Sequence, residues 1–371
     1  MEKKIHVVAF QNPFPPTYGG VMDVYYKLRE LRRAGAHVVL HAFVYGRRTA
    51  MSPELADVAD EVYFYRRHTG LLSFFSRKPY ITRSRRSSLL VRRLAADNAP
   101  VIFEGLHCCD AIDHPALAGR VKVLRAHNVE HDYYAALAAR EKNLLKRIYL
   151  KLEARRLRRF EPRAVAAASI VAAVSEADTA AFRSAYPDVV TVFAPCFFNA
   201  DRPAKLPERR RFVLFHGNLS VSENIDAALR IITRISPLLP DEKFVIAGFS
   251  PDSSIMKGAS EQPNVEVVNS PSPQQMDSLI RSAQVNLLIT GMTTGIKLKL
   301  LGSLAAAGQI VVNPAMIAGT SLGNVCRVAD TDEQIADAIA CALDEPFDGR
   351  ELPEAYNPAI VARKLLEHIG Y

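Results

Sequence analysis

Short runs rich in β-branched residues alternate with helical stretches along almost the whole chain, and this alternation constrains the fold more than any other feature. A strand followed by a crossover helix is the unit from which parallel sheets are built. The first series of expected strands covers residues 5–10, 37–43, 61–65, 101–105, 121–126 and 170–174. The second series covers residues 212–216, 244–248, 265–268, 285–290, 310–313 and 325–329. The sequence therefore predicts an α/β protein with two parallel sheets, each buried on both faces.

A Pro-containing polar stretch, 194–207, separates the two series and is followed by the charged residues 208–211. Such a stretch just ahead of a new strand is typical of a domain boundary. A chain of 371 residues also suits two domains of ordinary size, each with its own core. We expect an N-terminal domain over 1–200, a C-terminal domain over 201–355, and a terminal helix within 356–371.

The amino-acid composition is that of a globular protein and does not identify a binding partner. Hydrophobic residues make up 49% and charged residues 23% of the chain, which is ordinary for a globular protein. No apolar run approaches the roughly 18 residues that span a bilayer, and the run at 5–10 is too short for a signal peptide. Five cysteines lack the spacing of a zinc site or a disulfide framework, which favours a reducing compartment. We therefore predict a cytoplasmic protein.

The net charge of +8 favours an anionic partner. A nucleotide diphosphate, a lipid phosphate, a membrane surface and a nucleic acid all fit that charge. A nucleic acid is disfavoured because the sequence has no recognition motif and no interleaving of aromatic and basic residues.

The first expected strand ends in a Pro-rich turn that leads to Gly19 and Gly20 at the start of a helix. Glycines there let backbone N–H groups approach a ligand, and the N-terminus of a helix favours negative charge. A tight turn explains the same residues equally well. The pattern is not G-x-G-x-x-G, so no nicotinamide cofactor is expected.

Polar residues are concentrated after the strand at 121–126, in the sequence VKVLRAHNVEHDYY. In an open parallel sheet this end of a strand faces the ligand crevice. His127 is the candidate catalytic residue, because an imidazole can bond an acceptor hydroxyl and take up a proton near neutral pH. Four neighbours are expected on the acceptor side: Arg125, Asn128, Glu130 and Asp132. His107 and Asp110 follow another strand and either line the same crevice or face solvent.

Residues 141–161 combine apolar residues at helical spacing with eight Lys or Arg. A basic amphipathic helix can lie on an anionic bilayer, where each cation contributes about 1 kcal/mol. A solvated helix face explains the pattern equally well. We therefore predict possible peripheral contact with the inner face of the cytoplasmic membrane.

Two loops in the second half favour a phosphate ligand. Gly217 and Asn218 follow the strand at 212–216, where small and amide residues let a substrate approach the backbone. The second loop, residues 290–296, precedes a helix that begins with two lysines. Positive charge at the N-terminus of a helix is unfavourable unless an anion is bound there. The expected donor-binding residues there are Thr293, Thr294, Gly295, Lys297 and Lys299, with Lys297 expected to be the lysine that reaches the ligand.

Taken in order, these segments resemble the retaining GT-B glycosyltransferases of the glycosyltransferase group 1, or family 4-like, type, notably bacterial enzymes of cell-surface polysaccharide synthesis. The resemblance rests on the Tyr18-Gly19-Gly20 loop, RAHNVEHDYY with the basic helix after it, AVSEAD, HGNLSVSEN and GIKLKLLGSLAAAGQIVVN. It implies two Rossmann-like domains with parallel sheets facing across a cleft.

The resemblance also implies how such a protein works. The C-terminal domain would bind a nucleotide-sugar, and the N-terminal domain would bind a glycan or lipid-linked acceptor. Transfer would need neither a bound metal nor a cofactor. His127 matches the family's acceptor-side histidine and Gly20 its glycine near the donor phosphate. The terminal helix would cross back onto the first domain.

The chain departs from the family's pattern in the donor half. Members carry an Arg and a Lys where this chain has Asn218 and Glu223. They also carry two glutamates eight positions apart, which fall here near Thr294 and Gly302 or near Gly295 and Ser303. The alternative to an active transferase is therefore a catalytically inactive binding subunit of a polysaccharide-assembly complex. A sugar-nucleotide epimerase of the same fold ranks below both.

Overall fold

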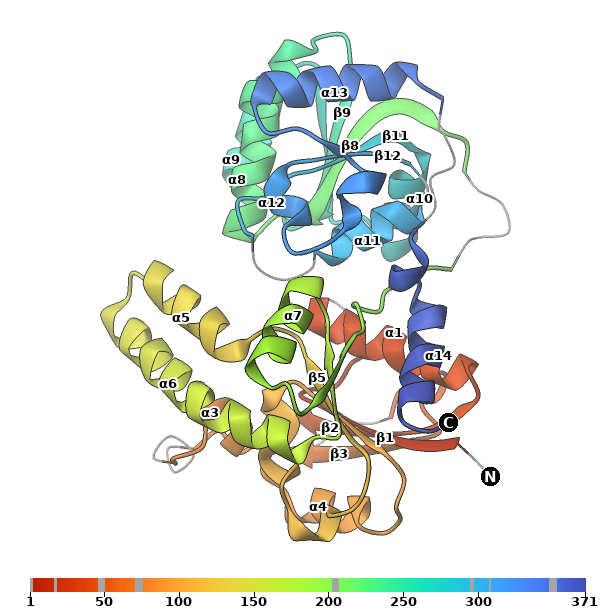
Figure 1. Cartoon of the computed structure of the whole chain (residues 1–371). Helices are drawn as coiled ribbons and strands as arrows, with labels where there is room; N and C mark the ends of the chain where they lie inside the picture. The colour runs from red at the N-terminus through yellow and green to blue at the C-terminus, as the bar shows by residue number, and fades with distance from the viewer. Residues whose placement is uncertain are drawn as a thin grey trace. The chain divides into compact units, whose positions relative to one another are not determined.

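The computed structural model describes residues 3–16, 19–45, 51–70, 76–201, 207–293, 297–306, 308–346 and 352–371. The chain divides into two compact units (Figure 1). The first unit comprises Met1–Phe198 and Ala355–Tyr371, and the second comprises Asn199–Glu354. The second unit is thus an insertion near the end of the first.

The first unit is built on a sheet of seven parallel strands in the order β3-β2-β1-β4-β5-β6-β7. The strands are β1 Lys3–Ala9, β2 Ala36–Val44, β3 Glu61–Arg66, β4 Val101–Glu104, β5 Lys122–Ala126, β6 Ile170–Ala173 and β7 Val190–Phe193. Alternate residues of β1 belong to different cores: Ile5 and Val7 pack on one face of the sheet and Val8 on the other. Both faces are therefore buried, as the continuous apolar strands predict.

The helices of the first unit connect these strands. They are α1 Gly19–Arg33, α2 Pro53–Ala56, α3 Tyr80–Arg83, α4 Ser88–Leu94, α5 Glu130–Arg140, α6 Leu144–Ala167 and α7 Glu176–Ala185. Short 3-10 turns cover Leu106–Ala111 and Pro115–Leu117. Helices α5 and α6 form a hairpin that extends from the body of the unit (Figure 1).

The terminal helix α14, Pro358–His368, belongs to the first unit and packs against α1. Asn357 caps its N-terminus by accepting from the backbone N–H of Ala359 at 3.0 Å. Leu365 and Leu366 enter the same core as Ile5 and Val7. The last helix of the chain therefore completes a core that the first strand begins.

The second unit contains six parallel strands in the order β10-β9-β8-β11-β12-β13. The strands are β8 Arg210–Asn218, β9 Phe244–Phe249, β10 Val265–Asn269, β11 Ala283–Leu288, β12 Gln309–Val312 and β13 Arg327–Val328. Its helices are α8 Ser222–Arg230, α9 Ser253–Ser260, α10 Pro273–Ser282, α11 Leu298–Ala305, α12 Pro314–Ile317 and α13 Asp332–Asp344. A π-helical turn, Ile231–Ile235, follows α8, and short 3-10 turns cover Ser236–Leu238, Leu322–Val325 and Glu354–Tyr356.

The predicted α/β class with two parallel sheets is confirmed, and each of the twelve expected strands overlaps a strand of the structure. The sequence analysis missed β7, although the run Val189 to Phe193 is rich in β-branched residues. Among the described helices, none has both the length and the apolar character needed to cross a bilayer.

Candidate active site

In the first unit, five charged or titratable side chains meet where β4 and β5 end. Asp23 and Lys27 lie one turn apart on α1, which follows β1. Glu104 is the last residue of β4, Arg125 lies in β5, and His127 follows β5. This is the edge of a parallel sheet where ligands bind, because the strands' carboxyl ends and the loops after them meet there.

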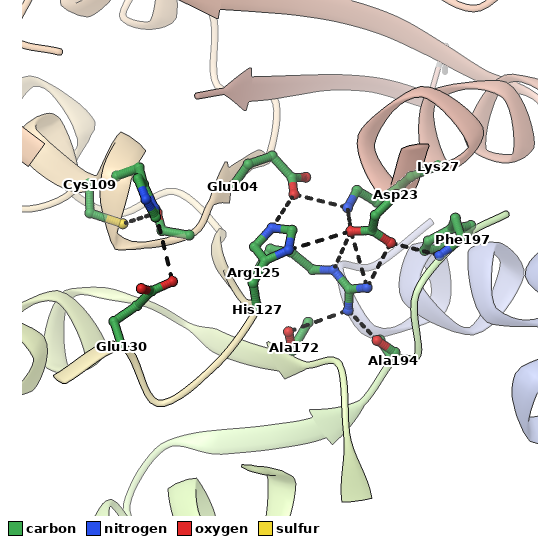
Figure 2. A network of polar contacts seen from close by, with 12 residues as sticks. Asp23, Lys27, Glu104, Cys109, Arg125, His127, Glu130, Ala172, Ala194 and Phe197 are labelled. Carbon is green, nitrogen blue, oxygen red and sulfur yellow. Dashed lines mark hydrogen bonds and ion pairs between the residues drawn. The ribbon is translucent and has the colours of Figure 1, made fainter. Parts of the chain in front are cut away.

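Hydrogen bonds join these side chains into one network (Figure 2). The Lys27 ammonium donates to Asp23 Oδ2 and to Glu104 Oε2, each at 3.0 Å. His127 Nε2 lies 3.1 Å from the same Glu104 oxygen, and His127 Nδ1 lies 3.9 Å from Asp23 Oδ2. Arg125 Nη2 donates to Asp23 Oδ1 at 3.1 Å.

Burial makes the charge balance of this network important. The side chains of Asp23, Lys27, Glu104 and Arg125 are at most 1% exposed. Burial alone would raise the pKa of the Asp23 carboxyl, but Arg125 and Lys27 hold it below its ordinary value. The pKa of Glu104 is lowered in the same way, against the effect of burial, by Lys27 and His127. Both carboxyls are therefore ionised, so Glu104 accepts a hydrogen bond from the N–H group at His127 Nε2.

Arg125 lies in the interior of the unit, not at its surface. Besides binding Asp23, its guanidinium donates to the carbonyl oxygens of Ala194 and Pro195. Asp23 Oδ1 accepts from the backbone N–H of Phe197 at 2.6 Å. The arginine expected on the acceptor side thus ties the segment after β7 to α1 and β5.

Asp23, Glu104 and His127 also offer three ligand atoms within 4.8 Å of one another, a set of donors that a divalent cation can use. The Lys27 ammonium, however, already bonds both carboxylates. A cation bound there would have to displace this ammonium, so the residues do not fit a resident metal.

His107 and Glu130 lie close to this network. Gly105 adopts φ +67° after β4, and a side chain there would come within 3.0 Å of His107 Nδ1. That nitrogen is buried without a hydrogen-bond partner in the described part of the chain, and Glu130 Oε1 lies 4.0 Å from it. Burial raises the pKa of Glu130 to about 8, and Glu161 and Asp178 add to the shift. Glu130 is therefore largely protonated at neutral pH.

The remaining acceptor-side residues are less enclosed. Asn128 is half-buried, and Asp132 is exposed with a carboxylate oxygen 3.4 Å from His131 Nε2. Asp110 pairs with Lys78 at 3.2 Å. The Phe10 ring packs against both histidine rings of the site, with centroids 5.6 Å from His107 and 5.9 Å from His127. At the start of α1, Gly19 is exposed and Gly20 half-buried.

In the second unit, the turn after β8 is fixed by Asn224 of α8. Its amide Nδ2 donates to the carbonyl of Asn218 at 3.0 Å. A side chain at Gly217 would come within 3.1 Å of the Asn224 amide, a tight contact that glycine avoids. Gly217 and Asn218, both expected in the donor site, are the last two residues of β8 and lie against Asn224.

Lys299 of α11 reaches the same turn. Its ammonium donates to Asn224 Oδ1 at 3.1 Å and lies 5.0 Å from the centroid of the Phe215 ring. Burial lowers the pKa of Lys299 to about 8, although Glu223 opposes the shift. Lys297 precedes the first residue of α11, and burial also lowers its pKa. Lys299 thus bonds to Asn224, and the expectation that Lys297 is the lysine that reaches the ligand stays a prediction.

Hydrogen bonds also join the ends of β11 and β12 to α8. The Thr290 backbone N–H donates to Asn313 Oδ1 at 3.1 Å, and Asn313 Nδ2 donates to the Thr290 carbonyl at 2.7 Å. The Thr290 hydroxyl bonds Glu223. Thr293 is exposed in the loop that follows, whereas Thr294 and Gly295 lie outside the described residues.

Sequence reasoning missed Asp23, Lys27 and Glu104 in the first unit and Thr290 and Asn313 in the second. Asp23 and Lys27 sit on a helix whose i and i+4 spacing reads as an ordinary ion pair. The useful signal was a charged residue at the end of an apolar strand, as at Glu104. A charged residue at the end of an apolar strand is also common on the protein surface, so this pattern alone does not identify a site.

Comparison with solved structures shows which fold the chain has. A Burkholderia xenovorans α,α-trehalose-phosphate synthase in complex with glucose-6-phosphate matches with a TM-score of 0.65 and 13% identity, over 99% of this chain and 100% of that one. Anabaena Alr3699/HepE in complex with UDP and glucose matches with a TM-score of 0.61 and 12% identity, over 99% and 95%. WaaG, a glycosyltransferase involved in lipopolysaccharide biosynthesis, matches with a TM-score of 0.60 and 13% identity, over 98% and 95%. The chain therefore has the GT-B glycosyltransferase fold, which confirms the fold that the resemblance implied.

The sequence comparison adds a genetic context. A Klebsiella pneumoniae protein, "Uncharacterized 44.6 kDa protein in cps region", is 24% identical over 355 residues, which cover 90% of this chain and 86% of the relative. No protein-family model matches the chain.

Proposed function

We propose that this chain is a glycosyltransferase of cell-surface polysaccharide synthesis, which moves a sugar from a nucleotide-sugar to a glycan or lipid-linked acceptor. The observation that carries the proposal is the half-buried ammonium of Lys299, held beside the end of β8 by Asn224. A lysine in the first turn of a helix opposes the helix dipole unless an anion is nearby. The Glu223 carboxylate already interacts with this ammonium, and the donor's diphosphate would be the second anion there. The GT-B fold and the relative from a cps region support this choice.

The donor diphosphate would lie between the turn at Gly217 and the start of α11. Asn218, Thr293, Lys297 and Lys299 would supply its hydrogen-bond donors. As the bond between the anomeric carbon and the diphosphate oxygen breaks, negative charge develops on the leaving group. A preorganised ammonium stabilises that charge without rearranging during the reaction. We infer a metal-independent reaction that retains the anomeric configuration, as the resemblance implies.

The acceptor would lie in the first unit, at His127. Because Glu104 accepts from Nε2, the ring's lone pair is on Nδ1, which has no hydrogen bond to Asp23 at 3.9 Å. That nitrogen can accept the proton that the acceptor hydroxyl loses as its oxygen bonds to the anomeric carbon. Glu104 and Asp23 would stabilise the resulting imidazolium. Asn128 and Asp132 are the side chains available to bind acceptor hydroxyls.

One observation favours a second candidate, the inactive binding subunit. Helix α11 has the sequence LKLLGSLA, which contains no carboxylate to bind the donor's sugar or ribose. Glu223, at the position where the family that the chain resembles carries a lysine, is bonded to Thr290. Such a subunit would keep the fold and bind a nucleotide or a partner without transferring a sugar.

A thermal-unfolding screen with UDP, GDP and ADP tests the donor site without knowledge of the acceptor. A ligand at about 100 times its Kd stabilises the native state by about 2.7 kcal/mol. We expect one nucleotide to raise the Tm of the wild type and not that of Lys299→Met. Lys257→Met is the matched control, because Lys257 lies on the exposed surface of α9.

Two results separate the candidates. If no nucleotide shifts the Tm, both the donor site and the transferase are rejected. If the nucleotide binds but the nucleotide-sugar is neither transferred nor hydrolysed, and a His127→Ala strain makes normal polysaccharide, the binding subunit is favoured.

A further inference from the structure

The hairpin of α5 and α6 contains a pocket that the proposed reaction does not use. The pocket has a volume of about 510 Å³ and lies between the two helices. Its apolar lining consists of four alanines: Ala135, Ala138, Ala139 and Ala154. The rest of its lining consists of His131, Arg147, Lys151, Arg155 and Arg158. It is therefore a cationic pocket with a small-residue floor.

The four cations of this pocket recur along one face of α6. Arg147, Lys151 and Arg155 follow one another at intervals of four residues, and Arg158 follows three later. In the described part of the chain, none of the four forms an ion pair with a carboxylate. Their charges are uncompensated and close together, an arrangement that favours a bound anion.

Other basic residues of the hairpin do have carboxylate partners. Lys146 pairs with Glu141 at 2.7 Å, and Arg156 pairs with Glu153 at 3.5 Å. The only two acidic residues within α6, Glu153 and Glu161, are buried. In the described part of the chain, neither carboxylate of α6 pairs with the four cations of the pocket.

An exposed apolar strip runs beside the cations at the N-terminal end of α6. Leu144 is 58% exposed and Leu145 is 79% exposed. Ile148 and Leu152 continue the strip and are 47% and 45% exposed. Four large aliphatic side chains that are exposed together on one helix surface are unfavourable in water. Such a surface is typical of one that a membrane or a partner protein covers.

We propose that this hairpin is a binding site for an acidic phospholipid at a bilayer surface. The phosphate of the headgroup lies in the pocket, against Arg147, Lys151, Arg155 and Arg158. The apolar strip, residues 144, 145, 148 and 152, enters the acyl region beside it. Cations that hold phosphate and leucines that enter hydrocarbon are the two components of interfacial anchoring.

The chemistry of the lining distinguishes this partner from other polyanions. A single-stranded nucleic acid is held by aromatic rings stacked on its bases, and apart from His131 the lining residues carry no aromatic ring. An acidic peptide or a soluble phosphate would leave the leucines in water. An acidic phospholipid provides a phosphate for the cationic pocket and an acyl region for the apolar strip. This inference does not depend on the proposed sugar transfer.

Vesicle cosedimentation tests the site with the full-length protein. Vesicles of phosphatidylcholine alone are compared with vesicles in which about one lipid in four is phosphatidylglycerol. We expect the wild type to bind the acidic vesicles at least about tenfold more tightly and to lose that advantage in Arg147→Ala/Lys151→Ala. Leu145→Ser/Ile148→Ser should also weaken binding, without a change of charge.

Matched controls separate the pocket from the general charge of the protein. Lys257→Ala/Lys364→Ala removes the same charge from exposed positions on α9 and α14. Leu238→Ser removes another exposed leucine, in the second unit. Both controls should bind acidic vesicles as the wild type does. A wild-type Tm in every variant, measured without ligand, would show that each is folded and would keep this test separate from that of the donor site.

Three results would overturn the proposal. The first is equal binding to neutral and acidic vesicles. The second is an equal loss of binding in the Lys257→Ala/Lys364→Ala control. The third is full competition by inorganic phosphate at concentrations comparable to those of the lipid, which would assign the pocket to a soluble anion.

Discussion

At the scale of single residues, burial determines which side chains can act as charges. Lys299 and Glu130 are both enclosed, and both have pKa values of about 8, reached from opposite directions. For the lysine, burial lowers the pKa, so the ammonium is charged below about pH 8. For the glutamate, burial raises the pKa, so the carboxyl is neutral below about pH 8. Both groups therefore change charge just above neutral pH.

The titration of Lys299 predicts how nucleotide binding depends on pH. Only the ammonium attracts a diphosphate, so affinity should fall as pH rises through about 8. We expect a loss on the order of tenfold between pH 7 and pH 9.5 by titration calorimetry. The Lys299→Met variant should bind weakly with little dependence on pH. A wild-type affinity that stays constant over this range would contradict the assignment.

The titration of Glu130 predicts how stability depends on pH. Its pKa is about 8 in the folded state and near 4.5 in the unfolded chain. The folded state therefore binds more protons between these values, and the free energy of unfolding falls as pH rises through them. For one such carboxyl the loss over the whole pH window is on the order of 5 kcal/mol.

Denaturant unfolding at several pH values checks this expectation. Glu130→Gln should show a flatter dependence between about pH 5 and pH 8, because the amide does not ionise. Glu54→Gln, at an exposed position on α2, should follow the wild type. If Glu130→Gln also follows the wild type, Glu130 does not have the raised pKa.

At the scale of elements, the second unit depends on the close approach of β8 and β9. Gly217 and Gly248 are partners in the parallel register. A side chain at Gly248 would lie 1.9 Å from the Gly217 carbonyl oxygen and 2.7 Å from Leu219. The end of β8, with Gly217 and Asn218, therefore packs directly against β9, a strand that contributes no side chain to the candidate donor site.

This contact predicts that Gly248→Ala changes both stability and binding. The added methyl must displace the β8 turn, and overpacking of this kind costs about 1 to 3 kcal/mol. We expect a lower denaturation midpoint and loss of the nucleotide-induced Tm shift. Gly258→Ala, where the new atom meets its nearest neighbour at 3.4 Å inside α9, should leave nucleotide binding intact. Normal binding in Gly248→Ala would show that the turn tolerates displacement.

The elements were easier to predict from the sequence than the sites. Apolar runs such as Phe244 to Ala247 are continuous, because strands buried on both faces tolerate few polar residues. Contacts between distant elements leave no local pattern. Nothing in the neighbourhood of Asp23 indicates that Arg125 and Phe197 bond it. In the same way, the sequence around Lys299 does not show that Asn224, 75 residues earlier, bonds its ammonium.

At the scale of the whole molecule, the first unit is assembled from both ends of the chain. Helix α14 supplies Leu365, Leu366 and Ile369 to the core that contains β1 and α1. A polypeptide that lacks this helix would expose that apolar face. The stability of the first unit therefore depends on residues that follow the second unit in the sequence.

Truncating one buried side chain of α14 tests this dependence. Leu365 is 2% exposed, and removal of such a leucine costs about 2 to 5 kcal/mol. We expect Leu365→Ala to lower the free energy of unfolding of the first unit, measured by hydrogen exchange of β1 and β2. Lys364→Ala, at the neighbouring exposed position, should have little effect. Equal exchange in the two variants would mean that α14 adds little to the core.

The same arrangement has a consequence for biosynthesis. A ribosome delivers the seven-stranded sheet first, then the complete inserted unit, and only afterwards the helix that covers α1. During that interval the apolar face of the first unit that α14 later covers is exposed, although the strands beside it have already been synthesised. Chaperone binding to the nascent chain and its aggregation should therefore be greatest while residues 199–357 are being translated. A stop codon shortly before α14 should yield insoluble protein, even though nearly every strand has been made.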